Sequence, residues 1–320
     1  MLVFSAAILV GLIILVWSAD RFVTGAVGTA LKLGMTPMMV GLTVVAFGTS
    51  APELIVSATA ALEDVSNLAV GNAIGSNIAN IGLVLGVTAL VSPIPLKDSI
   101  LKVELPILLT ATLLATLLIW DQILDFNDGI FLALILFASM IALAKLPKKP
   151  VEDLEEIEQG AHISSHKAYF LLLMSLVLLL SSSKLLVWGA TGFAQSLGVS
   201  DLVIGLTIVA IGTSLPELAA SIASALKGHH DLALGNIIGS NLFNLLAVLA
   251  LPAMISPPML DKEVILRDYA LMLILTGVLA VIAYAYKALN RPNIGQVIGA
   301  LLLASYLIYL TVLYQQSAPA

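Results

Sequence analysis

Two glutamates lie inside stretches that are otherwise almost wholly apolar. Glu53 stands in "GLTVVAFGTSAPELIV", and Glu217 stands at the matching place in "GLTIVAIGTSLPELAA", 164 residues later. A charged side chain at the centre of a bilayer costs about 2.5–3.5 kcal/mol on insertion scales. Carrying that cost twice, at matching positions, indicates a cation-binding function. The alternative is a protonated carboxyl pair that only holds two parts of the chain together.

Further oxygen donors surround each glutamate. A proline directly precedes it, and because proline cannot donate a backbone hydrogen bond, the helix should be disrupted there. We expect this to free carbonyl groups about one turn upstream, at Ala46 and Ala210. Unwound backbone at membrane depth is tolerated only where something else satisfies it, and a bound cation would do so. Hydroxyl oxygens come from Thr49, Ser50, Thr213 and Ser214.

A second motif is also duplicated at the same offset. "LAVGNAIGSNIAN" at 68–80 returns as "LALGNIIGSNLFN" at 232–244. In each copy a serine and an asparagine are four residues apart, which puts both on one helix face. We interpret the glycines as packing residues, since small-xxx-small patterns let helices approach closely. A buried amide needs polar partners, so we expect the asparagines to be ligands. These residues are Ser76, Asn80, Ser240 and Asn244.

The donor set predicts the kind of ion. The chain has no cysteine, and its four histidines lie in predicted loops. Oxygen donors without sulfur or imidazole suit Ca²⁺, which takes about 6–8 oxygen ligands, and they argue against zinc or copper. Na⁺ is equally hard and of similar size, so the same site could take either ion. Two carboxylates neutralise one Ca²⁺ or two Na⁺.

Composition places these motifs in a membrane. Of 320 residues, 60% are apolar and 11% charged, with a mean hydropathy of +1.07. A soluble domain is about half apolar and about a quarter charged. There is no basic patch to suggest nucleic acid, and the N-terminal segment is interpreted as a transmembrane helix rather than a signal peptide.

Spanning the hydrocarbon core takes about 20 apolar residues, which predicts ten spans. The first and sixth are long and contain polar residues, so each is either one steeply tilted helix or two shorter pieces. The predicted spans are 2–33, 36–62, 67–92, 102–120, 127–146, 167–198, 201–226, 231–256, 267–287 and 294–314.

The two duplicated motifs share one offset, so the halves of the chain are copies. Eleven of fourteen positions from Gly41 are identical in the first motif, and nine of thirteen in the second. Each half holds five spans, an odd number, so the second half should be inverted, as in many secondary transporters. We predict an all-α polytopic membrane protein. It would consist of one five-helix repeat (1–146), a cytoplasmic linker (147–166) and a second, inverted repeat (167–320).

Loop charges predict the orientation, because Lys and Arg favour the cytoplasmic side. With both termini outside, eleven of the fourteen basic residues fall on the inner side. We therefore expect a multi-pass protein of the plasma or inner membrane with both termini extracytoplasmic. Asp20, next to Arg21 in the first span, is expected at the inner interface.

The paired "GTSAPE" and "GTSLPE" motifs, each followed by "GNxIGSN", resemble the two α-repeats of the calcium/cation antiporter superfamily, especially its prokaryotic sodium/calcium exchanger branch. The resemblance covers the whole layout. It implies a core of spans two, three, seven and eight, across which spans one and six slide to give alternating access. It also implies exchange of about three Na⁺ for one Ca²⁺.

The resemblance assigns roles to the same residues. Glu53 and Glu217 would be ligands shared by both ions, and carbonyls of Ala46 and Ala210 would help flanking Na⁺ sites. Some relatives carry Asp where this chain has Asn80 or Asn244, so the central charge here is only −2. The remaining ligands would be Thr49, Ser50, Ser76, Thr213, Ser214 and Ser240.

Three other functions stay open. A proton/calcium or other cation exchanger could use the same fold, although such proteins usually lack the Thr-Ser pair beside the glutamate. An intramembrane hydrolase would need a membrane-embedded His or a Ser-Lys pairing, and a channel would not need inverted repeats with broken helices. We expect no enzyme activity, no cofactor and no obligate protein partner, with Ca²⁺, Na⁺ and the bilayer as the only partners.

Overall fold

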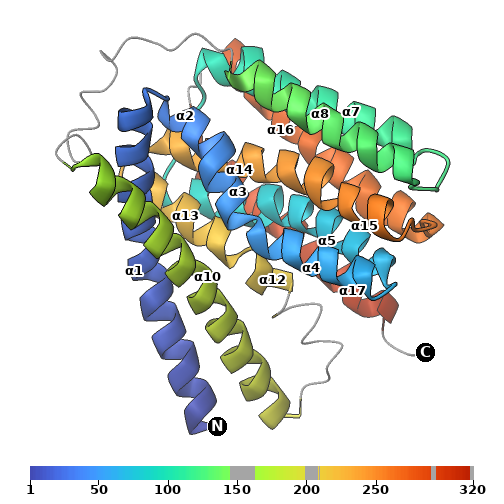
Figure 1. Cartoon of the computed structure of the whole chain (residues 1–320), viewed down its shortest axis with the longest axis horizontal. Coiled ribbons are helices and arrows are strands. Elements are labelled where there is room, and N and C mark those ends of the chain that lie inside the picture. Colours follow the sequence, from blue (N-terminus) through green and yellow to red (C-terminus); the bar gives the residue numbers. More distant parts are fainter. Residues whose placement is uncertain (145–162, 199–207, 209, 290–292, 318–320) are drawn as a thin grey trace.

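The computed structural model describes residues 1–144, 163–198, 208, 210–289 and 293–317, and these are almost entirely helical (Figure 1). Several helices contain π-helical segments, labelled η. The first half comprises α1 (Leu2–Leu33), α2 (Pro37–Val40), η1 (Gly41–Val45), α3 (Ala46–Thr49), α4 (Ala51–Leu62), α5 (Ser66–Ala79), η2 (Asn80–Leu85), α6 (Gly86–Val91), β1 (Ile94–Pro95), η3 (Ile100–Glu104), α7 (Leu105–Ile119) and α8 (Phe126–Ala144). The second half comprises α10 (Ser165–Ser196), α12 (Ala210–Thr213), α13 (Leu215–Leu226), α14 (His230–Phe243), η6 (Asn244–Val248), α15 (Ala250–Ile255), η7 (Val264–Tyr269), α16 (Ala270–Ala288), β2 (Asn293–Ile294) and α17 (Gln296–Ser317).

Within the described residues, eight helices are long and apolar enough to cross a membrane, and a ninth if the bent pair Pro37–Thr49 and Ala51–Leu62 is one span. The predicted seventh span, 201–226, falls partly outside the described residues and is seen as α12 and α13. The long first and sixth spans are each one helix of 32 residues. The alternative of two shorter pieces is therefore wrong.

The predicted break before each glutamate is present. The chain bends by 44° between α3 and α4, and Ser50 between them is not helical. Ser214 separates α12 from α13 in the same way. Pro52 and Pro216 each stand in the first turn of the new helix, where a missing N–H costs nothing because first-turn N–H groups have no partner within the helix. Each glutamate thus lies in the first turn of a helix, just after the break.

The main apolar core is built around α5 and α14, with their continuations η2–α6 and η6–α15. These two spans are the most buried of the candidate spans. Side chains of α7, α8, α16 and α17 pack around them in one cluster. Among the described residues, no member of that cluster comes from α1 or α10.

α1 and α10 form a separate antiparallel pair at one edge of the molecule (Figure 1). Glycines bring the two backbones together: a Cβ added to Gly25 would lie 2.5 Å from the Leu172 nitrogen, and one added to Gly189 would lie 3.0 Å from the Phe4 oxygen. Two smaller clusters, centred on Phe22 and on Leu15, join this pair to the rest of the protein. The molecule therefore consists of a large helical body and a two-helix pair with a smaller contact to it.

Short loops tie the ends of the helices together. β1 pairs with β2 in antiparallel register, with Ile94 opposite Ile294. Asp98 accepts from Lys287 Nζ at 2.7 Å and lies 3.2 Å from Lys102 Nζ. The hydrogen bonds from these ammonium groups hold the pKa of the Asp98 carboxyl below its usual value. Because this carboxyl is fully exposed, solvent screening leaves the cluster little weight in stability.

Candidate cation-binding site

The glutamate-bearing breaks of the two halves meet directly. Ser50 Oγ, in the first half, donates to Glu217 Oε1, in the second, at 3.1 Å. η2 of the first half also packs against α13, and η6 of the second half packs against α4. The two predicted glutamates therefore belong to one arrangement, with each half contributing to the surroundings of the other half's carboxylate.

Both glutamates are buried, each with 1% of its surface exposed. Within the described part of the chain, neither takes part in an ion pair. The predicted ligands Ala46, Thr49, Ser50, Ser76, Asn80, Ser214, Ser240 and Asn244 are buried as well. Thr213 is half-buried, and Ala210 is the first residue of α12.

Polar atoms without a partner gather in this set. In the described residues, fourteen buried side-chain N or O atoms have no hydrogen-bond partner. Eight of the fourteen belong to Glu53, Asn80, Ser214, Glu217, Ser240 and Asn244. A native interior leaves few buried polar atoms unsatisfied, and each one needs an explanation. Buried oxygens without a hydrogen-bond partner are suited to coordinating a cation, whereas the two amide nitrogens are not.

The backbone is irregular at both asparagines. Asn80 begins η2 and Asn244 begins η6, exactly one repeat apart in the sequence. π-helical turns inside α-helices are rare and are often found at functional sites. The irregularity therefore lies at the predicted amide ligands in both halves.

The carbonyl expected to be freed at Ala46 is instead bonded, because Ser50 N donates to Ala46 O at 2.9 Å. That prediction was wrong: proline removes the donor to the residue four before it, which is Gly48 or Gly212. In the second half, Ser183 Oγ of α10 donates to Gly212 O at 2.9 Å. Thr49 Oγ1 also lies 3.4 Å from Ala46 O, so in this structure both lone pairs of that carbonyl have a donor nearby.

The residues present fit a hard cation. Within the described residues, no group of three or more His, Cys, Asp or Glu side chains could hold a metal. The two carboxylates are instead accompanied by neutral hydroxyl and amide oxygens, which suit Ca²⁺ or Na⁺ rather than a transition metal.

A family model described as "Sodium/calcium exchanger protein" matches residues 3–146 and 167–315. The chain belongs to this family. It is a membrane protein of the calcium/cation antiporter type, in the prokaryotic sodium/calcium exchanger branch, and its fold is that of a transporter.

Similar proteins match this exchanger along nearly its whole length. It is 46% identical to the putative antiporter CaxA of Alkalimonas amylolytica, over 98% of this chain and 99% of the relative. It is 29% identical to the sodium/calcium exchanger MaX1 of Methanosarcina acetivorans, over 96% and 97%. The solved sodium-calcium exchanger NCX_Mj superposes with a TM-score of 0.84 at 32% identity, covering 97% of this chain and 99% of that one.

Two further asparagines brace the site of this exchanger. Asn236 Nδ2 donates to Glu217 O at 3.3 Å and to Ser221 Oγ at 3.0 Å. One repeat earlier, Asn72 Nδ2 makes the same two bonds, to Glu53 O at 3.1 Å and Ser57 Oγ at 3.0 Å. Each asparagine thereby fixes the helix that carries a glutamate.

The sequence analysis missed these two residues, although they lie in the quoted motif. The signal was the Gly-Asn pair, identical in both copies. The braces are not equivalent in this structure. Asn236 is 1% exposed and also accepts from Thr49 Oγ1 of the other half at 3.1 Å, whereas Asn72 is half-buried.

The brace and the ligand asparagines should respond differently to truncation. Asn236→Ala removes three hydrogen bonds and leaves buried partners unsatisfied, at about 1–3 kcal/mol for each stranded group. Asn244→Ala removes no hydrogen bond to the described residues. We expect thermal unfolding in detergent to show a clear loss of stability for Asn236→Ala and little change for Asn244→Ala. Equal losses in the two variants would contradict the distinction between brace and ligand.

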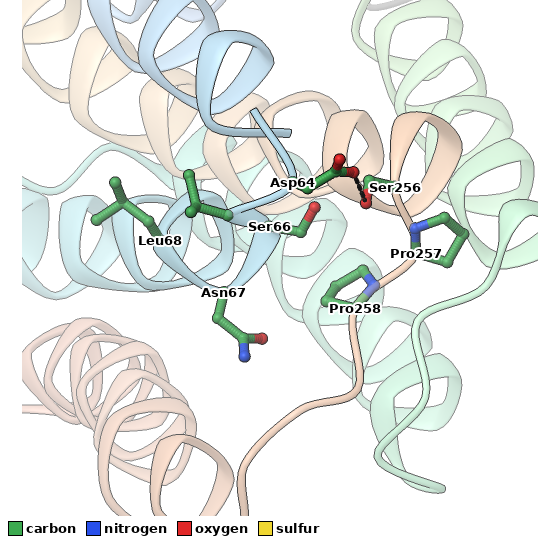
Figure 2. A pocket seen from close by; sticks show the side chains of 8 residues that line it. Asp64, Ser66, Asn67, Leu68, Ser256, Pro257 and Pro258 are labelled. Carbon is green, nitrogen blue, oxygen red and sulfur yellow. Dashed lines mark hydrogen bonds between the residues drawn. The ribbon is translucent and has the colours of Figure 1, made fainter. Parts of the chain in front are cut away.

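A separate cavity of about 370 Å³ lies away from the glutamates, where the α4–α5 turn meets the end of α15 (Figure 2). Figure 2 shows Asp64 and Ser256 facing each other across its rim, with Ser256 Oγ donating to Asp64 Oδ1 at 3.0 Å. Asp64 has a φ of 59°, a left-handed conformation that Asp tolerates better than most residues. This contact joins a turn of the first half to the residue that follows α15 in the second half.

Proposed function

We propose that the protein exchanges Na⁺ for Ca²⁺ across the membrane by alternating access. About three Na⁺ would move against one Ca²⁺, with the sites near the membrane midplane on interrupted helices. Exchange of this kind moves one net charge in each cycle, so transport is electrogenic.

One observation carries the proposal: two buried carboxylates have no basic partner among the described residues, while unsatisfied oxygens surround them. An unpaired buried charge is strongly unfavourable. It must be neutralised by a cation or a proton, and the array of neutral oxygens around it favours a metal cation. Similarity to the sodium/calcium exchanger MaX1 and to NCX_Mj, whose structures were determined after soaking with Na⁺ and Ca²⁺, supports this choice.

In the proposed site, Glu53 and Glu217 are the ligands shared by the two ions. Asn80 and Asn244 contribute amide oxygens, and the carbonyls of Ala46 and Ala210 serve flanking Na⁺ ions. Hydroxyl oxygens come from Thr49, Ser50, Ser76, Thr213, Ser214 and Ser240. No resident cofactor is needed, because the ions are the substrates.

We further propose the full architecture of ten spans in two inverted repeats, 1–146 and 167–320, joined by a cytoplasmic linker at 147–166. Residues 147–162 of the linker lie outside the described residues, and its last two residues already belong to α10 (Ser165–Ser196). The protein would span the cell membrane with both termini extracytoplasmic, following the distribution of Lys and Arg.

Coupling follows from the charge of the site. Without a bound cation, a doubly negative site resists the movement that transfers it from one side to the other. Either one Ca²⁺ or several Na⁺ cancel that charge and lower the barrier. Because both ions need the same carboxylates, one leaves when the other binds, and the two fluxes are coupled.

The test is uptake of radiolabelled Ca²⁺ into proteoliposomes loaded with Na⁺ and diluted into Na⁺-free buffer. We expect uptake that requires the outward Na⁺ gradient and increases with an inside-positive potential. Each net charge that crosses 100 mV changes the driving force by about 2.3 kcal/mol, so the voltage effect should be large. Uptake without Na⁺ dependence, driven only by a pH gradient or by another cation, would overturn the choice of substrate and leave the fold standing.

A further inference from the structure

Lys227, at the end of α13, fastens the helical body to α1. Its Nζ lies 2.8 Å from Asp20 Oδ1, 2.8 Å from Asp20 O and 2.9 Å from Thr24 Oγ1. An ammonium group has three donors, and all three are used on this one stretch of α1. Asp20, expected only at the membrane interface, is thus part of a specific contact between the body and the two-helix pair.

The sequence repeat supplies a second pair in corresponding positions, with the charges reversed. At the offset of 164 residues, Asp20 of α1 corresponds to Lys184 of α10, and Lys227 corresponds to Glu63. Glu63 directly follows α4 and Lys227 directly follows α13, the two helices that carry a site glutamate in their first turn. In one pair the long helix carries the acidic residue, and in the other pair the long helix carries the basic residue.

The register of α1 and α10 places Asp20 and Lys184 symmetrically. Gly11 faces Leu186, and Gly25 faces Leu172. With this register, the centre about which α1 and its repeat counterpart α10 are symmetric lies between residues 16 and 17 of α1. Asp20 lies about one helical turn, or ~5 Å, to one side of that middle, and Lys184 lies the same distance to the other side. Asp20 therefore lies toward one end of the helix pair, and Lys184 lies toward the other end.

The second pair is not formed in this structure. Lys184 and Glu63 are both exposed, and neither has an ion pair with any described residue. One ion pair is formed and its counterpart is not. The two halves therefore differ at the boundary between the body and the two-helix pair.

The glycines show the same asymmetry. Gly235 packs against the backbone of the first half, so an added Cβ would lie 2.6 Å from Met38 O. Its counterpart, Gly71, is exposed, and no atom of a described residue lies within 4 Å of a Cβ added there. A repeat whose two halves differ in this way is in one of two related states, and exchanging the roles of the halves gives the other.

We propose that Asp20–Lys227 and Lys184–Glu63 are alternative ion pairs, closed in opposite states of the transport cycle. The first holds the α1–α10 pair in the position seen here, and the second holds it after the pair has moved along the body. These four side chains are positioning residues that bias which side of the membrane has access to the site. The proposal rests on alternating access and does not depend on which ion is carried.

The chain has no cysteine, so paired cysteines test this directly. Asp20→Cys/Lys227→Cys and Glu63→Cys/Lys184→Cys are reconstituted and treated with a short, reducible bifunctional thiol reagent. We expect both pairs to cross-link, each arresting calcium flux until the link is reduced. The four single-cysteine variants measure background labelling.

A second measurement tests the competition between the two pairs. Adding Lys227→Met to Glu63→Cys/Lys184→Cys should raise the cross-linking rate about two- to fivefold, the range expected for a partly exposed ion pair. Adding Asp20→Lys/Lys227→Asp instead, which restores a pair with reversed charges, should return the rate toward its starting value. A purely structural role for Lys227 would lower stability without favouring the 63–184 link.

The proposal is overturned if 63 and 184 never cross-link in protein that transports ions, or if Lys227→Met leaves their rate unchanged. The function can fail separately. Cross-linking of both pairs in a protein without sodium-dependent calcium uptake would retain the alternating ion pairs and remove the substrate assignment.

Discussion

Glu217→Gln and Glu53→Gln should each nearly abolish calcium exchange. Glutamine keeps the shape of the side chain but removes half of the negative charge of the proposed site. Breaking a buried ion pair by removing one partner costs about 3–5 kcal/mol, which is about 10²–10³-fold or more in affinity. We expect calcium uptake into Na⁺-loaded proteoliposomes to fall to background in both variants, and calcium-dependent protection against thermal unfolding to disappear.

The unfolding temperature of the two variants, measured without bound ions, distinguishes loss of the ion site from loss of the fold. Each glutamate is buried without an ion pair to a described residue, so its neutral replacement should unfold at the same temperature or a higher one. Glu263→Gln, at an exposed position before η7, is the matched control and should transport normally. Near-normal calcium flux in both site variants would contradict the site assignment.

Gly235→Ala should destabilise the protein, whereas Gly71→Ala should not. In the first variant the new Cβ meets backbone atoms, 2.6 Å from Met38 O and 3.1 Å from Leu42 N, which cannot move as a side chain would. Overpacking of this kind costs about 1–3 kcal/mol. Gly71 is exposed and no described residue lies within 4 Å of the added methyl, and replacing glycine inside a helix gains about 0.5–1 kcal/mol. The midpoints of thermal unfolding in one detergent measure the difference.

Gly71 and Gly235 are matched controls for each other, because they hold the same place in the two repeats. Under alternating access, Gly71 takes the packed role in the opposite state. Gly71→Ala should therefore slow calcium exchange even though the protein unfolds no earlier. Equal shifts in stability for the two variants would show that the asymmetry between the halves does not persist in solution.

Much of the helix layout was readable from the sequence, because apolar runs of the right length between polar loops have few alternatives in a membrane. The breaks before Glu53 and Glu217 were predicted for a similar reason, since proline cannot donate a backbone hydrogen bond. Which carbonyl the break frees depends on the position of proline in the helix turn, and the prediction of Ala46 was two residues away from Gly48. The duplicated motifs also identified the family, now shown by the match to the exchanger model.

The sequence by itself determined which residue types are available to bind a cation and that they come in two copies. It could not determine which copy is packed and which is open, because two near-identical motifs predict the same local structure. Only the tertiary structure places Asn236 against Thr49 and leaves Asn72 half-buried, and only it joins Lys227 to Asp20 while leaving Lys184 and Glu63 apart. These differences arise from contacts between segments far apart in the chain, and a symmetric sequence can satisfy them in one half at a time.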